Sequence, residues 1–163
     1  MIIRRMKWAL SLVLALGICW APATANIGGR GAPVVATDTG VAPDDFADGY
    51  QAIEAGEYER AIDFFSGIAG ADPTNAEAYN QLGYINRRLQ NFPQAFAFYH
   101  KALELDPQHT GAHHYIGEAY LEVGDLANAE DHLRRLDLIC LFGCDDFFEL
   151  QQAVALYRSN QTG

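Results

Sequence analysis

Cys140 and Cys144 are the residues of this chain best suited to covalent or metal chemistry. They lie four positions apart, with Gly143 between them. Cα atoms four residues apart in a helix are about 6 Å from each other, inside the range that a disulfide spans. The pair would serve as a structural staple, as a thiol-redox site or as a site for a soft metal ion such as Cu(I). We favour the disulfide, which contributes roughly 2 kcal/mol through chain entropy.

Three histidines form a second group of candidate ligands. His109 and His113 are four positions apart and would share a helical face, and Glu118 lies one turn from His114. Two imidazoles can begin a zinc site, but such a site needs three or four ligands. We favour histidines that are packed or solvated and bind no metal, and we expect no cofactor.

The motifs of common enzyme classes are missing from the sequence. It contains no G-x-S-x-G, no H-E-x-x-H, no P-loop and no paired-glycine phosphate motif. A cysteine with a histidine would make a nucleophile pair, but a disulfide would silence it. We therefore expect no catalytic residues and no enzyme activity.

Residues 76–107 must form the elements that position these groups. Apolar residues recur with helical spacing in two segments, separated by a break at 89–91. Pro93 stands in the first turn of the second helix, where no backbone N–H is lost, and Pro107 ends that helix. Asn75 and Thr110 are expected to cap the helices that follow them. The stretch predicts a helix–turn–helix unit.

The same unit recurs on both sides at a period of 34 residues. The positions that keep this period are Gly49, Gly83 and Gly117 in the first helix, and Ala61, Ala95 and Ala129 in the second. A mid-helix glycine costs roughly 1 kcal/mol against alanine, so its repetition indicates close backbone approach. The pattern resembles the tetratricopeptide repeat. The residues that carry the resemblance are Tyr79, Leu82, Gly83, Ala95, Tyr99, Ala102, Pro107, Gly117, Tyr120 and Ala129.

The resemblance implies an all-α solenoid with a domain at residues 43–158. Its three tandem repeats would span about 42–75, 76–109 and 110–143. The first repeat departs from the family pattern at Asp45 and Asp48, as an N-terminal capping repeat would. Residues 145–158 would form a capping helix that covers the last hairpin, which gives seven helices in total.

In the family, the first helix of each repeat supplies most of a concave groove that binds a protein or peptide. Carried over to this chain, the groove consists of Phe46, Tyr50, Tyr84, Arg87, Arg88, His114, Glu118 and Glu122. Some relatives clamp a C-terminal carboxylate with Asn and Lys. Asn80 is one step from that position and Lys101 lies on a second helix, so no clamp is expected. His113 stands where the family places a core aromatic, which leaves His109 and His114 in solvent.

The first 25 residues have the pattern of a secretory leader. Its parts are the basic residues Arg4, Arg5 and Lys7, an apolar run ending at Trp20, and the cleavage site Ala23-Thr24-Ala25. The run is shorter than the ~20 residues of a membrane span, so no stable membrane anchor is expected after cleavage. Residues 26–42 are predicted to be a flexible linker. The product would be periplasmic or secreted, where disulfides form.

The net charge of the chain limits the classes of partner that it is expected to bind. With 11 basic and 21 acidic residues the net charge is −10, and removal of the three basic leader residues makes it −13. Such a charge argues against nucleic acid and anionic membranes. The sequence therefore predicts an exported, non-catalytic adaptor that binds a protein or peptide in its groove, and a homodimer through flat end helices is a further prediction. The alternative is a thiol-redox or Cu-handling protein that uses Cys140 and Cys144.

Overall fold

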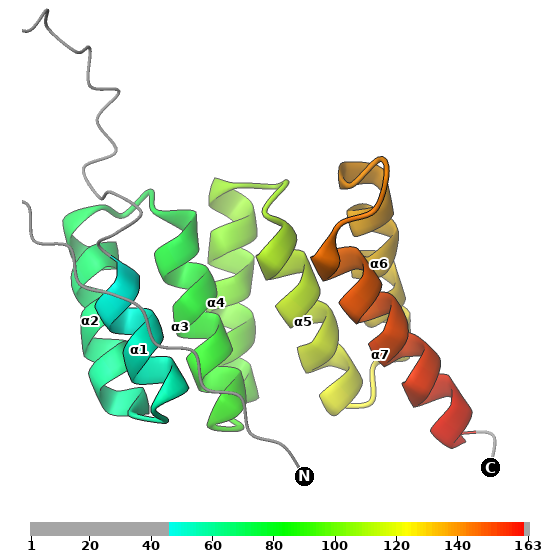
Figure 1. Ribbon diagram of the computed structural model, residues 1–163, viewed down its shortest axis with the longest axis horizontal. Coiled ribbons are helices and arrows are strands. Elements are labelled where there is room, and N and C mark those ends of the chain that lie inside the picture. The colour runs from blue at the N-terminus through cyan, green and yellow to red at the C-terminus, as the bar shows by residue number, and fades with distance from the viewer. Residues whose placement is uncertain (1–45, 162–163) are drawn as a thin grey trace, which may run out of the picture. The chain divides into compact units, whose positions relative to one another are not determined.

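The computed structural model describes residues 46–161, and this part of the chain is α-helical (Figure 1). It contains seven helices and no strand: α1 (Ala47–Glu54), α2 (Tyr58–Ala71), α3 (Ala76–Arg88), α4 (Phe92–Leu105), α5 (Thr110–Glu122), α6 (Leu126–Ile139) and α7 (Asp145–Gln161). The predicted fold class and number of helices are confirmed. The predicted leader and linker lie outside the described residues. None of the described helices is long and apolar enough to cross a membrane.

Polar side chains cap the starts of α3, α5 and α6. Asn75 caps α3 as predicted, because its Oδ1 accepts a hydrogen bond of 2.9 Å from the Ala78 backbone N–H. The cap predicted at Thr110 is wrong, since Thr110 is already the first residue of α5. His109 caps this helix instead, and its Nδ1 accepts a 3.2 Å bond from the Ala112 N–H. A histidine N-cap has no strong sequence signal, because Ser, Thr, Asp and Asn lead that position.

The helices pack in chain order, each against the next, in two layers. Helices α1, α3 and α5 lie in front of α2, α4 and α6 in Figure 1, and α3 also contacts α5 directly. The last helix, α7, packs on both α5 and α6. It therefore occupies the place that the first helix of a fourth repeat would take, and covers the apolar face of the last hairpin.

The periodic glycines accept large side chains from neighbouring helices. A Cβ atom built on Gly83 would lie 2.6 Å from the Tyr99 ring, and one on Gly49 would lie 2.6 Å from the Phe65 ring. On Gly117 it would lie 2.6 Å from Leu150, which comes from α7 and not from α6. The predicted close approach is thus made by a side chain and not by backbone. These contacts fix α7 on α5, because Leu150 has no exposed surface.

A left-handed residue closes the turn inside each repeat. Gly56 and Gly124 take positive φ angles of 73° and 84°, and Gln90, which stands midway between them at the same period, has φ 59°. Glycine adopts this conformation without a steric penalty, but in other residues Cβ approaches the following carbonyl oxygen. The second repeat therefore contains a strained turn that its neighbours avoid.

Replacement of Gln90 by glycine is expected to stabilise the protein by about 0.5–1 kcal/mol, because it relieves that strain at an exposed position. The gain is smaller than the full penalty because glycine also loses more backbone entropy on folding. Urea unfolding followed by circular dichroism measures it. Gln94→Gly, inside α4, is the matched control and should destabilise by about 1 kcal/mol. Equal destabilisation by both substitutions would contradict the assignment of strain.

Candidate functional site

The face formed by the first helices α1, α3 and α5, together with α7, carries the residues that the resemblance placed in a groove. These residues lie on α1, α3 and α5 or, for Phe46, just before α1, and they differ in exposure. Phe46 is only 9% exposed and its ring lies 5.9 Å from that of Phe65. Tyr50 is 38% exposed, and its hydroxyl donates a 2.8 Å hydrogen bond to Glu77. Phe46 therefore belongs to the core more than to a binding surface.

An aromatic and cationic cluster lies at the C-terminal end of α3. The rings of Tyr84 and Tyr115 lie 5.0 Å apart between their centroids, and both remain partly exposed. Arg88 is exposed, donates a 2.9 Å hydrogen bond to the Tyr84 hydroxyl and places its guanidinium 5.7 Å from that ring. Of the predicted groove residues, Tyr84 and Arg88 thus offer both ring surface and free hydrogen-bond donors to a partner.

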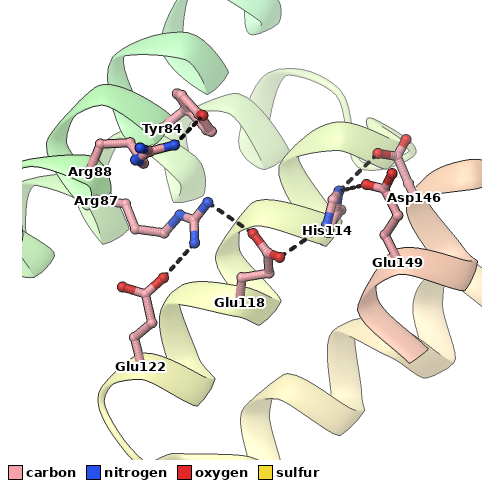
Figure 2. A network of polar contacts seen from close by, with 8 residues as sticks. All are labelled: Tyr84, Arg87, Arg88, His114, Glu118, Glu122, Asp146 and Glu149. Carbon is pink, nitrogen blue, oxygen red and sulfur yellow. Dashed lines mark hydrogen bonds and ion pairs between the residues drawn. The ribbon is translucent and has the colours of Figure 1, made fainter. Parts of the chain in front are cut away.

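Arg87 points instead into a network of ions that joins α3 to α5 (Figure 2). Its guanidinium lies 2.8 Å from the Glu118 carboxylate and also binds Glu122, and only 10% of its side chain is exposed. Burial of an unpaired arginine costs free energy. The two carboxylates, both on α5, offset this cost and join α3 to α5. Arg87 is therefore a structural cation more than a group available to a ligand.

His114 extends the network from α5 to α7 (Figure 2). Its Nδ1 lies 3.1 Å from Asp146 and 3.6 Å from Glu149, and its Nε2 lies 3.5 Å from Glu118. Burial lowers the pKa of this imidazole, but Asp146 and Glu118 outweigh burial and raise the pKa to about 9. The side chain is only 4% exposed, so the prediction that His114 lies in solvent is wrong. It is a buried imidazolium at neutral pH.

Glu77 is a second centre of polar contacts, and sequence reasoning missed it. Its carboxylate accepts hydrogen bonds from Tyr50 at 2.8 Å and from Gln81 at 2.6 Å, and pairs with the His109 Nε2 at 2.9 Å. Burial raises the pKa of this carboxyl, but the three partners outweigh burial and lower it. His109 is thus paired with Glu77 and not simply solvated. Through Tyr50 and His109, Glu77 connects α1 and α3 to the start of α5.

His113 pairs with a histidine that the sequence analysis did not consider. Its Nδ1 lies 2.8 Å from the Nδ1 of His132, while its Nε2 lies 3.1 Å from the Pro107 carbonyl oxygen. Burial and the neighbouring His113 lower the pKa of His132 to about 4. The predicted burial of His113 is confirmed, at 3% exposure. The partner was hard to foresee because His132 lies 19 residues away.

The cysteine pair lies in the loop between α6 and α7. The structure places the sulfur atoms of Cys140 and Cys144 within bonding distance, with Cα atoms 5.6 Å apart. Gly143 has φ 82°, which gives the loop the sharp bend that the spacing requires. Among residues 46–161 there is no group of three or more His, Cys, Asp or Glu side chains that could hold a metal ion.

Comparisons with known proteins identify the repeat. Residues 76–109 match the family model of the tetratricopeptide repeat. The chain is 27% identical over 104 residues to a peroxisomal targeting signal receptor of Candida glabrata, covering 64% of this chain and 17% of the receptor. It is 34% identical over 88 residues to sperm-associated antigen 1 of Mus musculus, covering 54% of this chain and 10% of that protein. The chain thus matches only a small part of each relative.

Solved structures share the fold at low identity. The first TPR domain of Spaghetti (RPAP3) bound to the HSP90 peptide SRMEEVD matches with a TM-score of 0.62 and 22% identity, over 71% of this chain and 88% of that one. The type III secretion translocator chaperone SycD of Yersinia enterocolitica matches with a TM-score of 0.64 and 15% identity, over 74% and 85%. The described helices therefore have the arrangement of a tetratricopeptide-repeat solenoid.

The raised pKa of His114 makes stability depend on pH in the alkaline range. An unfolded histidine titrates near pH 6.5, whereas His114 in the folded protein titrates near 9. The stabilisation is therefore fully present below about pH 6.5 and is lost as the pH rises through 9. We expect the melting temperature to fall between pH 7 and 9.5, and to fall much less in His114→Gln.

The matched control is His100→Gln, at an exposed position on α4. It should keep the pH slope of the unchanged protein when melting is followed by calorimetry. A His114→Gln variant with an unaltered slope would contradict the assignment of a buried imidazolium.

Proposed function

We propose that this protein is a non-catalytic adaptor that binds a segment of another protein on the face formed by α1, α3, α5 and α7. The single observation that carries the proposal is the cluster of Tyr84, Tyr115 and Arg88 on that face. Tyrosine and arginine anchor protein interfaces because they combine large contact area with directed hydrogen bonds. A repeat solenoid presents such a face without needing a loop or a cofactor to build it.

The pairing of charges supports a non-catalytic role. Arg87, His114 and Glu77 each lie against oppositely charged partners within 3 Å or slightly more. General acid–base catalysis needs a group that is free to exchange a proton with substrate. Here burial lowers the pKa of His114, but Asp146 and Glu118 outweigh burial and raise this pKa to about 9, and the pair with Asp146 joins α5 to α7. Burial is the main cause of the lowered pKa of His132.

The structural neighbours suggest the kind of ligand but not its identity. Two similar domains are described in complexes with chaperone ligands, an HSP90 peptide for the RPAP3 domain and pHsp70 for the TPR2B domain of yeast Sti1. In this chain Asn80 is 2% exposed and donates to Glu77, and Lys101 pairs with Glu104 on α4. Neither residue is available to clamp a C-terminal carboxylate, so we expect a different segment as partner.

Export to an oxidising compartment is a further part of the proposal. It is motivated by the leader pattern of residues 1–25 and by the Cys140–Cys144 pair. In this environment the two cysteines act as a staple between α6 and α7. The thiol-redox or Cu-handling alternative needs further ligands or a free thiolate, and no cluster of three metal-binding side chains occurs among the described residues.

The staple and the redox site differ in how easily the bond is reduced. We expect mass spectrometry of the protein purified from the exported fraction to show a linked Cys140–Cys144 peptide that persists in a glutathione buffer. The double substitution Cys140→Ser with Cys144→Ser should lower stability by at most about 2 kcal/mol and leave partner binding intact. Reduction by glutathione, or copper that co-purifies with the protein, would favour the alternative.

The binding face is tested by substitution at its exposed anchors. Tyr84→Ala with Arg88→Glu is expected to abolish capture of the main partner from an extract of the exported compartment, with identification by mass spectrometry. The matched control is Phe142→Ala with Arg134→Glu, which removes an exposed aromatic ring from the α6–α7 loop and reverses an exposed arginine on α6. Retention of every partner by the Tyr84 and Arg88 variant, with a native circular dichroism spectrum, would overturn the assignment of the face.

A further inference from the structure

A groove between α5 and α7 adjoins the face described above. Two neighbouring hollows share Ala153 and Leu156 and run along the second half of both helices. Their walls consist of Leu121, Glu122, Tyr157 and Asn160 on one side of the shared pair, and Glu118, Glu149 and Gln152 on the other. The groove is open along its length, which suits an extended or helical segment more than a small molecule.

The floor of this α5–α7 groove is apolar. Leu156 is 61% exposed, although it lies beside Ala153 at the centre of the groove, and Leu121 forms part of the same wall. A leucine left this exposed keeps much of its surface in water, and burial of apolar surface is worth roughly 25 cal/mol per Å². The floor therefore offers an apolar anchor point on which an incoming side chain would gain free energy.

The rim of the groove is acidic, and its lining residues include no cation, although Arg87 on α3 pairs with Glu118 and Glu122 from outside the groove. The groove residues include Glu118, Glu122 and Glu149 and no Lys, Arg or His. Glu149 is 64% exposed, and its only recorded partner within the described residues is His114 at 3.6 Å. In the ion network of Figure 2 the cations Arg87 and His114 face four carboxylates, namely Glu118, Glu122, Asp146 and Glu149. Among the three carboxylates that line the groove, Glu149 is the most exposed and makes the longest of these contacts, so it stays accessible to a cation of a partner.

We propose that the α5–α7 groove binds a basic amphipathic segment of a partner protein. Apolar side chains of the segment pack on Leu156, and its Lys or Arg side chains meet Glu149 and the part of Glu122 that Arg87 leaves exposed. Complementary charge of this kind selects the partner and speeds association. The inference rests on the proposed function, since it names the chemistry of the segment that the adaptor binds.

The net charge of the chain argues against other occupants. A second copy carries the same excess of acidic residues, with a formal net charge of −10, so copies repel each other at an acidic groove. An anionic lipid surface or a nucleic acid is repelled for the same reason. A basic segment is the occupant whose charge complements both the groove and the whole chain.

Three synthetic peptides of about 18 residues, five helical turns, test the inference against the purified full-length protein. The first has leucines at helical spacing with lysines on the polar face. The second replaces every lysine by glutamate, and the third keeps the composition of the first in an order without helical periodicity. Fluorescence anisotropy at low salt should show binding of the first peptide alone, weakened at least tenfold when about 0.5 M NaCl screens the charges.

Substitutions locate the binding in the groove. Leu156→Glu is expected to weaken the lysine peptide at least tenfold, and Glu149→Lys at least fivefold. The matched controls are Leu138→Glu, at a leucine that is 76% exposed on α6, and Glu59→Lys, at an exposed position on α2. Both controls should bind the peptide as the unchanged protein does.

Each result decides between the groove and the face. Equal binding of the glutamate or the scrambled peptide, or unchanged affinity in Leu156→Glu and Glu149→Lys, would overturn the inference. If the lysine peptide fails to bind while capture of a partner still depends on Tyr84 and Arg88, the inference fails and the proposed function stands. If the Tyr84→Ala with Arg88→Glu variant captures the same partners as the unchanged protein, the proposed function fails, whatever the peptides do.

Discussion

The structure depends on one steric constraint, the absence of a side chain at the middle of each first helix. Phe65, Tyr99 and Leu150 each lie where a Cβ on the facing glycine would come within 2.6 Å. Protein interiors are packed so closely that such a site accepts a large side chain only if the opposite wall is bare. The backbone penalty of a mid-helix glycine is therefore offset by burial of a ring from the next helix at Gly49 and Gly83, and of a leucine from α7 at Gly117. Repeated three times, this contact sets how the helices lie beside each other.

Ion pairs restrict how the packed helices can shift along one another. Apolar burial alone would let one helix slide along another, whereas the Arg87 guanidinium and the His114 imidazolium each require carboxylates at fixed places. Buried ion pairs contribute little net free energy, since the cost of removing two charges from water nearly cancels their attraction. Their effect here is to fix the register of α3, α5 and α7, on which both the face and the α5–α7 groove are built.

The same network divides the candidate binding surface into two parts of different character. Near Tyr84 and Arg88 the surface is aromatic and cationic, whereas the groove around Leu156 is apolar and acidic. Arg87 pairs with Glu118 and Glu122, and His114 lies closer to Asp146 than to Glu149, so the Glu149 carboxylate stays largely exposed. A partner segment that crossed both parts would make aromatic contacts at one end and ionic contacts at the other.

The sequence by itself determined the fold class, the 34-residue period and the number of helices, because these follow from local spacing and turn residues, and it placed the cap of α3 at Asn75. It also singled out Tyr84, Arg88, Glu118 and Glu122, through their positions in the repeat. Only the tertiary structure decided that Phe46 and His114 are buried, that His109 replaces Thr110 as a cap, and that Glu77 and His132 are central partners. His109 is a local cap, which the sequence left unpredicted because histidine is not among the residues preferred at that position. For the other contacts the physical reason is distance along the chain, because Tyr50 with Glu77 and His113 with His132 join residues from different helices. A spacing rule carries no information about which side chains meet when helices stack.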